Sequence, residues 1–177
     1  MRSISPMETP QGALFTVRLP DTALPETLSG AHYLVLDGVQ DPGNVGTILR
    51  TLDAAGFDGC ILTPGCADPF APKTMRATMG SLFRVPMTFV ENSAEAARWL
   101  RTNGWAVIGA ELRGQPFYQR GTRPDKLCVL IGNEGAGLTE EILAQCSFRY
   151  KLPMRGGAES LNAGIAAAVM MYDLMNR

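Results

Sequence analysis

The stretch LPMRGGAESLNAGIAAAVMMYDLM (residues 152–175) combines the end of an apolar strand, a glycine turn and a helix rich in alanine. The helix is expected over about residues 160–175, because its apolar residues recur at the helical period. This apolar stripe, which predicts a core face or a face against a second subunit, consists of Leu161, Ile165, Val169 and Tyr172. Gly164 and the alanines make the helix thin, which would allow close packing against another backbone.

Ser160 and Asn162 lie where this helix would begin. A helix leaves its first backbone N–H groups unpaired, and Ser or Asn at that point most often caps them. A helix N-terminus can equally present such groups to a polar or anionic ligand. The residues alone leave both roles open, a cap and a ligand contact.

Outside this stretch, short apolar runs alternate with segments of helical periodicity. Strands are expected at residues 32–38, 59–64, 105–111, 127–133 and 148–154, and helices at residues 44–56, 72–79, 93–103, 138–146 and 160–175. Strands that alternate with helices favour a parallel sheet covered on both faces. We therefore predict an α/β fold whose ligands bind beyond the carboxyl ends of the strands.

The composition is that of a single globular domain. The chain has 177 residues, of which 46% are hydrophobic and 19% charged, a balance too apolar for disorder. It contains no run of eighteen apolar residues and no apolar secretory signal, so we expect a cytoplasmic protein without a membrane partner. A net charge of −1 gives no basic field, although 13 of the 16 basic residues are Arg, the better phosphate ligand.

The first thirty residues differ from the rest. Residues 1–30 hold four of the twelve prolines and predict a linker or N-terminal arm, with one short strand at residues 12–19. This arm is expected to join a segment further upstream, while residues 31–177 form the folded domain. The four cysteines form no C-x-x-C pair and His32 is the single histidine, so we expect reduced cysteines and no metal site.

A second loop with chemical character is LDGVQDPGNVGTILRTLDAAG (residues 36–56). Either Asp41 or Asn44 can cap the helix that follows. Arg50 lies off the apolar stripe of that helix, so it is available to a ligand unless it pairs with Asp53 one turn later. Gly46 is small enough to let a ligand approach the helix.

A third such loop is VLIGNEGAGLTEEIL (residues 129–143), in which three glycines follow an apolar strand. Glycine permits close approach of the backbone to a ligand, and Thr139 followed by two glutamates is a good helix start. The loop is neither a P-loop nor a dinucleotide fingerprint. Glu134 within it is either a solvated side chain or a functional one.

The three loops together resemble the three motifs of the SpoU/TrmH branch of the SPOUT methyltransferases. The matching patterns are N-x-G-x-x-x-R at residues 44–50, I-G-N-E-G-x-G-L at residues 131–138 and L-P-M-x(5)-S-L-N-x(3)-A at residues 152–166. The segment KTMRATMGSLFRVP (residues 73–86) is similar to the part of these proteins between the first two motifs. Their order and spacing match, and the resemblance covers about residues 31–177.

This resemblance implies a parallel α/β domain with a C-terminal trefoil knot, a homodimer, and methyl transfer from S-adenosylmethionine to a ribose 2′-hydroxyl of ribosomal or transfer RNA. Asn44, Arg50, Glu134, Ser160 and Asn162 occupy the catalytic and substrate positions of the family. Backbone groups of Gly109, Ala110, Ile131, Gly132, Leu152, Met154 and Leu161 would hold the cofactor. No metal is implied.

The role of Arg50 within that reaction follows from its chemistry. A guanidinium stays protonated in proteins, so we expect Arg50 to hold the target phosphate or stabilise a developing alkoxide and not to act as a base. Two other functions stay open. One is methylation of a base by the same fold, and the other is a catalytically silent module that binds RNA or nucleotides.

Overall fold

The computed structural model describes residue 13 and residues 15–176. Its centre is a six-stranded parallel sheet in the order β3-β2-β1-β5-β4-β6. The strands are β1 (His32–Leu36), β2 (Gly59–Leu62), β3 (Met87–Phe89), β4 (Ala106–Pro116), β5 (Leu127–Ile131) and β6 (Phe148–Lys151). The helices are α1 (Pro42–Ala55), α2 (Pro72–Thr78), α3 (Ser93–Thr102), α4 (Glu140–Leu143) and α5 (Ala163–Asn176), with the 3-10 turns η1 (Ser81–Phe83) and η2 (Phe117–Gln119). The predicted α/β class is confirmed.

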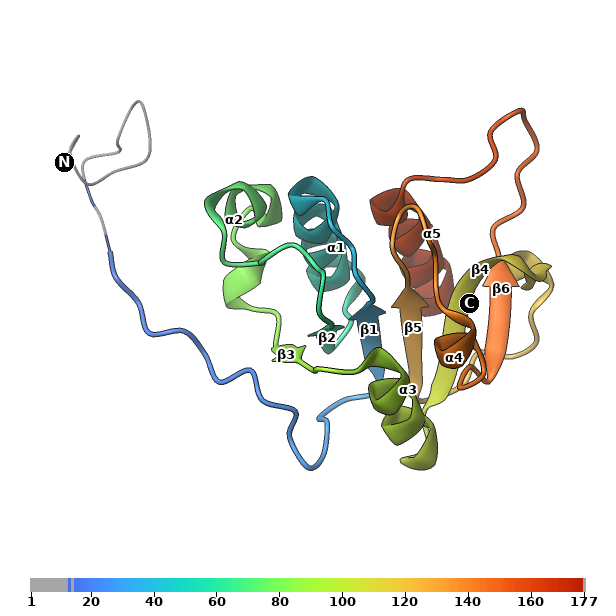
Figure 1. Ribbon diagram of the computed structural model, residues 1–177, viewed down its shortest axis with the longest axis horizontal. Helices are drawn as coiled ribbons and strands as arrows, with labels where there is room; N and C mark the ends of the chain where they lie inside the picture. Colours follow the sequence, from blue (N-terminus) through green and yellow to red (C-terminus); the bar gives the residue numbers. More distant parts are fainter. Residues whose placement is uncertain (1–12, 14, 177) are drawn as a thin grey trace.

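Both faces of the central strands are buried, as in β2 and β5. In β1, Leu34 and Leu36 pack into the core beneath α1 and α5, whereas Tyr33 and Val35 pack into the core beneath α3 and α4. Figure 1 shows α1 and α5 on one side of the sheet and α3 and α4 on the other, with α2 beside α1. Because successive strand residues point to opposite faces, a strand buried on both sides needs a continuous apolar run. The predicted helices on both faces are thereby confirmed.

Two strands differ from the prediction. Strand β3 was not predicted, because three residues are too few to show a pattern. The strand expected at 12–19 is wrong for residues 13 and 15–19, which are irregular, whereas residues 12 and 14 lie outside the described part. This segment pairs with no neighbouring strand, so it has no hydrogen-bond ladder to join. The arm contacts the edge of the sheet further along, where the backbone N–H of Phe89 donates to the carbonyl of Thr22 over 2.8 Å.

The face that α5 buries also differs from expectation. Its buried residues are Gly164, Ala167, Met170, Met171 and Leu174. The expected stripe is largely open, with Ile165 50% and Tyr172 45% exposed. The helix is apolar on nearly every side, so its periodicity could not identify the buried face. Of the two predicted roles for the stripe, core burial is wrong, and the role as an intersubunit face stays a prediction.

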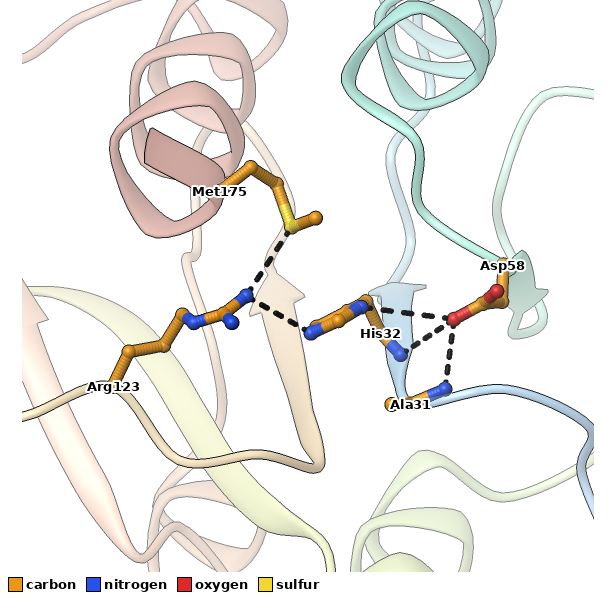
Figure 2. Close-up of polar contacts among 5 residues, drawn as sticks. All are labelled: Ala31, His32, Asp58, Arg123 and Met175. Atoms are coloured by element: carbon orange, nitrogen blue, oxygen red, sulfur yellow. Dashed lines mark hydrogen bonds and ion pairs between the residues drawn. The ribbon is translucent and has the colours of Figure 1, made fainter. Parts of the chain in front are cut away.

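A cluster of polar contacts holds the amino-terminal end of β1 (Figure 2). The carboxylate of Asp58 accepts the backbone N–H groups of Ala31 and His32, each over 2.8 Å. On the other side of the imidazole, Arg123 Nη1 lies 3.1 Å from His32 Nε2 and 3.7 Å from the sulfur of Met175. Burial and the charge of Arg123 lower the pKa of His32, against the opposing effect of Asp58. The neutral imidazole of His32 therefore contacts Arg123 in the segment before β5, and Arg123 in turn contacts Met175 of α5.

The cysteines are free thiols. Cys60 and Cys128 are buried, and burial raises the pKa of both far above the ordinary value, so they remain protonated. Within residues 13 and 15–176, no cluster of three His, Cys, Asp or Glu side chains could hold a metal. No helix in this same part of the chain is long and apolar enough to cross a membrane. The trefoil knot stays a prediction from the resemblance.

Candidate active site

The loop between β1 and α1 presents the side chain of Asn44. Asp41 caps α1, because its Oδ1 accepts the backbone N–H of Asn44 over 2.8 Å. Pro42 follows at the first helical position, where its missing N–H costs nothing. Of the two predicted caps, Asp41 is the one used. The amide of Asn44 is thereby left available for contacts with other loops.

The three motifs meet through a chain of hydrogen bonds, which we call the junction. Asn44 Nδ2 donates to Glu134 Oε1 over 2.9 Å, and Asn162 Nδ2 donates to Asn44 Oδ1 over 2.8 Å. The Oδ1 of Asn162 in turn accepts the N–H groups of Gly164 and Ile165, at 2.9 and 3.3 Å. Asn162 thus serves as the predicted cap of α5 and also contacts the first motif, whereas its role as a ligand contact stays a prediction.

Glu134 is held as a carboxylate. Besides the amide of Asn44, its two oxygens accept the backbone N–H groups of Gln40 at 3.2 Å and Asp41 at 3.4 Å. Burial opposes ionisation, but these hydrogen bonds outweigh it and place the pKa of Glu134 below its ordinary value. Both oxygens are engaged, so Glu134 is better suited to fixing the loops than to accepting a proton.

Asn133 supports the same junction and was missing from the predicted site residues. Its Nδ2 donates to the carbonyl of Gly38 over 2.8 Å, and its Oδ1 accepts the N–H groups of Gly135 and Ala136 at 2.9 and 3.0 Å. The side chain therefore fixes its own loop and ties it to the loop after β1. Its place between Gly132 and Glu134, in a motif already singled out, was the signal that could have identified it.

A cavity of about 520 Å³ opens beside this junction, at the carboxyl ends of β4, β5 and β6. Of the predicted cofactor residues, the cavity wall contains Ala110, Ile131, Gly132, Leu152, Met154 and Leu161. Of the predicted catalytic residues, it contains Glu134, Ser160 and Asn162. Gly109 is buried one residue before the wall, where an added Cβ would lie 2.8 Å from the sulfur of Cys146.

Two of the three glycines in the loop after β5, Gly132 and Gly137, are required by the loop itself. A Cβ on Gly132 would lie 2.4 Å from the carbonyl carbon of Gly137, so the two ends of the loop touch. Gly137 has a φ of 69°, a conformation that other residues rarely adopt. Thr139 caps the short helix α4 by accepting the N–H of Ile142, which confirms the expected helix start.

Arg50 is not brought to the junction within one chain. It is exposed, and six residues along α1 place it about 9 Å from Asn44 along the helix axis. Of the two alternatives for Arg50, the pair with Asp53 is not formed, because Asp53 instead binds Arg84 through a contact of 2.6 Å. Among the described residues, no hydrogen bond or ion pair engages the guanidinium of Arg50.

Gly46 serves helix packing and does not admit a ligand, contrary to the expectation from its size. A Cβ at this position would lie 2.4 Å from Cβ of Ala77 and 2.8 Å from the carbonyl oxygen of Thr74. Helix α1 therefore packs against α2 at a distance that only glycine permits.

The cavity suits S-adenosylmethionine. Its size lies within the range of small-molecule sites, and its wall combines apolar side chains with polar ones such as Asn162 and Glu134. An adenosyl group requires an apolar slot, whereas the reacting methyl group must meet polar residues. The residues present therefore fit this cofactor.

Comparison with known proteins agrees with this geometry. The profile of the SpoU rRNA Methylase family matches residues 31–172. RlmP of Bacillus subtilis, a 23S rRNA (guanosine(2553)-2′-O)-methyltransferase, is 36% identical over 172 residues, covering 97% of this chain and 68% of its own.

Solved structures give the same result. An rRNA methyltransferase from Sinorhizobium meliloti with bound AdoMet is 40% identical, with a TM-score of 0.77 over 82% of this chain and 56% of that one. The SpoU methyltransferase AviRb from Streptomyces viridochromogenes, in complex with the cofactor AdoMet, is 31% identical, with a TM-score of 0.78 over 89% of this chain and 62% of that one.

The chain thus spans about two thirds of the Bacillus relative and less of the two solved chains. The matched region nevertheless includes all three motifs and every residue of the junction described above. The chain therefore belongs to the SpoU rRNA methylase family.

Proposed function

We propose that this chain transfers a methyl group from S-adenosylmethionine to a ribose 2′-hydroxyl of RNA, either ribosomal or transfer RNA. The observation that carries the proposal is the hydrogen-bonded convergence of Asn44, Glu134 and Asn162 beside an adenosyl-sized cavity, whose wall contains Glu134 and Asn162. When bound, the cofactor supplies a methyl group on a sulfonium, which needs in-line attack and no metal. We further propose that residues 31–177 are the catalytic domain, that residues 1–30 are a linker, and that the protein acts in the cytoplasm.

The two asparagines are suited to positioning the attacking ribose. A side-chain amide has two N–H donors, and Asn44 and Asn162 each use one of theirs within the junction. The second N–H of each amide is left to hold a hydroxyl or phosphate oxygen of the RNA. Glu134 orients Asn44, and Ser160 on the cavity wall is a further contact for cofactor or ribose. Such preorganised donors stabilise charge that develops on the attacking oxygen.

Arg50 would complete the site as part of a homodimer. Its guanidinium is exposed and makes no hydrogen bond or ion pair with any described residue, so we propose that it serves the site of a partner subunit. The open apolar residues Ile165 and Tyr172 on α5 supply a face that a second copy would cover. In the partner's site, the guanidinium would hold the RNA phosphate or stabilise the developing alkoxide.

The proposal is tested by incubating the protein with labelled S-adenosylmethionine and ribosomal or transfer RNA from the source cells, followed by nuclease digestion and mass spectrometry. The expected product is a nucleoside methylated on ribose. Methylation of a base would contradict the ribose assignment. Binding of RNA with no affinity for S-adenosylmethionine in calorimetry would instead indicate the catalytically silent module.

A further inference from the structure

The cavity wall contains two acids, and one of them has an oxygen without a hydrogen-bond partner among the described residues. Both oxygens of Glu134 already accept hydrogen bonds. The other acid, Glu111, lines the cavity with its side chain only 13% exposed. Its Oε1 lies 3.3 Å from Arg113 Nε, and among residues 13 and 15–176 its Oε2 has no partner. This oxygen of a mostly buried carboxylate can therefore accept a hydrogen bond from a ligand in the cavity.

A bulge in β4 places Glu111 there. The pairing of β4 with β6 runs from Ala110 opposite Tyr150 to Gln115 opposite the same Tyr150, so residues 111–114 leave the ladder. Bulges re-aim side chains and are common beside active sites. The detour is held by Gly114, whose added Cβ would lie 2.7 Å from the backbone of Arg149. Glu111, the first residue of this bulge, lines the cavity.

Arg113 fixes the carboxylate and limits what it can bind. Its Nη2 donates to Glu140 Oε1 over 2.8 Å, so the guanidinium is held between two acids. A cation placed at the open oxygen of Glu111 would lie close to this guanidinium and be repelled. Neutral donors meet no such repulsion, and the hydroxyls of a ribose are neutral donors that acids beyond strand ends accept in other α/β folds.

We propose that Glu111 binds the ribose hydroxyls of the adenosine part of the cofactor through Oε2, and so selects ribose over deoxyribose. This inference rests on the proposed function, because it assigns Glu111 to the same adenosyl cavity. Under this inference, other groups bind the amino-acid part of the cofactor. Arg113, which contacts the Glu111 carboxylate, is then a positioning residue.

The test measures the binding of S-adenosylhomocysteine, of its 2′-deoxy analogue and of 5′-methylthioadenosine by calorimetry. The wild-type protein should bind the deoxy analogue roughly 10- to 100-fold more weakly than the parent, as expected for lost hydrogen bonds to a charged group. Glu111→Ala should bind parent and deoxy analogue equally weakly. It should weaken 5′-methylthioadenosine, which lacks the amino acid, by a similar factor.

Two variants control for folding and for charge. Glu111→Gln keeps the shape of the side chain and should show intermediate discrimination, with an unchanged circular dichroism spectrum. Glu141→Ala removes an exposed acid on α4 outside the cavity wall and should leave all three affinities unchanged.

The other outcomes separate the two proposals. Undiminished discrimination in Glu111→Ala would overturn the assignment while leaving the methyltransferase proposal standing. A loss of affinity for S-adenosylhomocysteine but not for 5′-methylthioadenosine would likewise overturn it, because the carboxylate would then hold the amino-acid part. If the wild-type protein bound none of the three ligands, the proposed function itself would fail and this inference with it.

Discussion

Asn44 donates a hydrogen bond of 2.9 Å to Glu134, although ninety residues separate them in the sequence. Asn44 lies at the start of α1 and Glu134 in the loop after β5, and the two loops adjoin because β1 and β5 are neighbouring parallel strands. The bond therefore connects the first two motifs, whose loops are brought together by the pairing of β1 with β5. It also holds the amide that we assign to the attacking ribose.

Glu134→Gln should lower kcat for methyl transfer by about 100-fold, the scale typical of a lost electrostatic positioning group. A glutamine places an N–H donor where one carboxylate oxygen accepted, which turns Asn44 or the backbone amides away. The Kd for S-adenosylmethionine, measured by calorimetry, should change less than about threefold, because the adenosyl slot lies elsewhere on the wall. An equal loss in cofactor affinity would assign Glu134 to cofactor binding.

The same carboxylate should stabilise the fold in a pH-dependent way. Its folded pKa lies below the unfolded value, so the folded state binds fewer protons. The stabilisation is complete above the unfolded pKa of about 4.3 and is lost as the pH falls through the lower folded pKa. The free energy of unfolding of the wild type minus that of Glu134→Gln, from urea titrations, should therefore shrink below about pH 4. A difference that grows on acidification would contradict this sign.

Substitutions of Ser160 and Asn162 should differ in their effects on stability. Asn162→Ala removes the α5 cap and should cost about 1 kcal/mol of stability as well as activity. Ser160 makes no hydrogen bond with any described residue, so Ser160→Ala should change stability by less than about 0.5 kcal/mol. Its methyl-transfer rate should nevertheless fall about tenfold, the scale of one lost hydrogen bond. Full activity in Ser160→Ala, assayed beside thermal unfolding, would remove Ser160 from the site.

Arg50 can be tested for action across subunits with two inactive variants. If Arg50 completes the partner's site, mixed dimers of Arg50→Ala and Asn44→Ala contain one intact site, because one chain supplies Asn44 and the other Arg50. Unfolding and refolding the variants together should then restore about a quarter of the wild-type activity. No recovery, with dimers shown by sedimentation, would place Arg50 in its own subunit's site. Arg50→Lys should stay impaired if the guanidinium binds phosphate through two hydrogen bonds.

Gly46→Val should destabilise the fold by about 2–3 kcal/mol, because the new side chain overlaps Ala77 and the carbonyl of Thr74. Thr47→Ala, at the exposed neighbouring position, is the matched control and should change stability by less than about 0.5 kcal/mol. Chemical denaturation measures both. A neutral Gly46→Val would show that α1 and α2 can separate without cost.

The sequence predicted the strands whose burial requires a continuous apolar run, as in β1 and β5, and hence the parallel sheet. It did not show β3, whose three residues are too short for a pattern. It also misplaced the open face of α5, because a helix that is apolar on nearly every side has no single periodic stripe.

The residues of the three motifs, from Asn44 to Asn162, were determined by the sequence alone, since glycine and polar residues after buried strands already select that edge of the sheet. Only the tertiary structure decided how they are used. In the tertiary structure, Asp53 binds Arg84 and both oxygens of Glu134 accept hydrogen bonds. Glu111 lines the cavity at a bulge in β4. The physical reason is that these contacts join residues far apart in the chain, and their geometry depends on strand order and register, which no local pattern encodes.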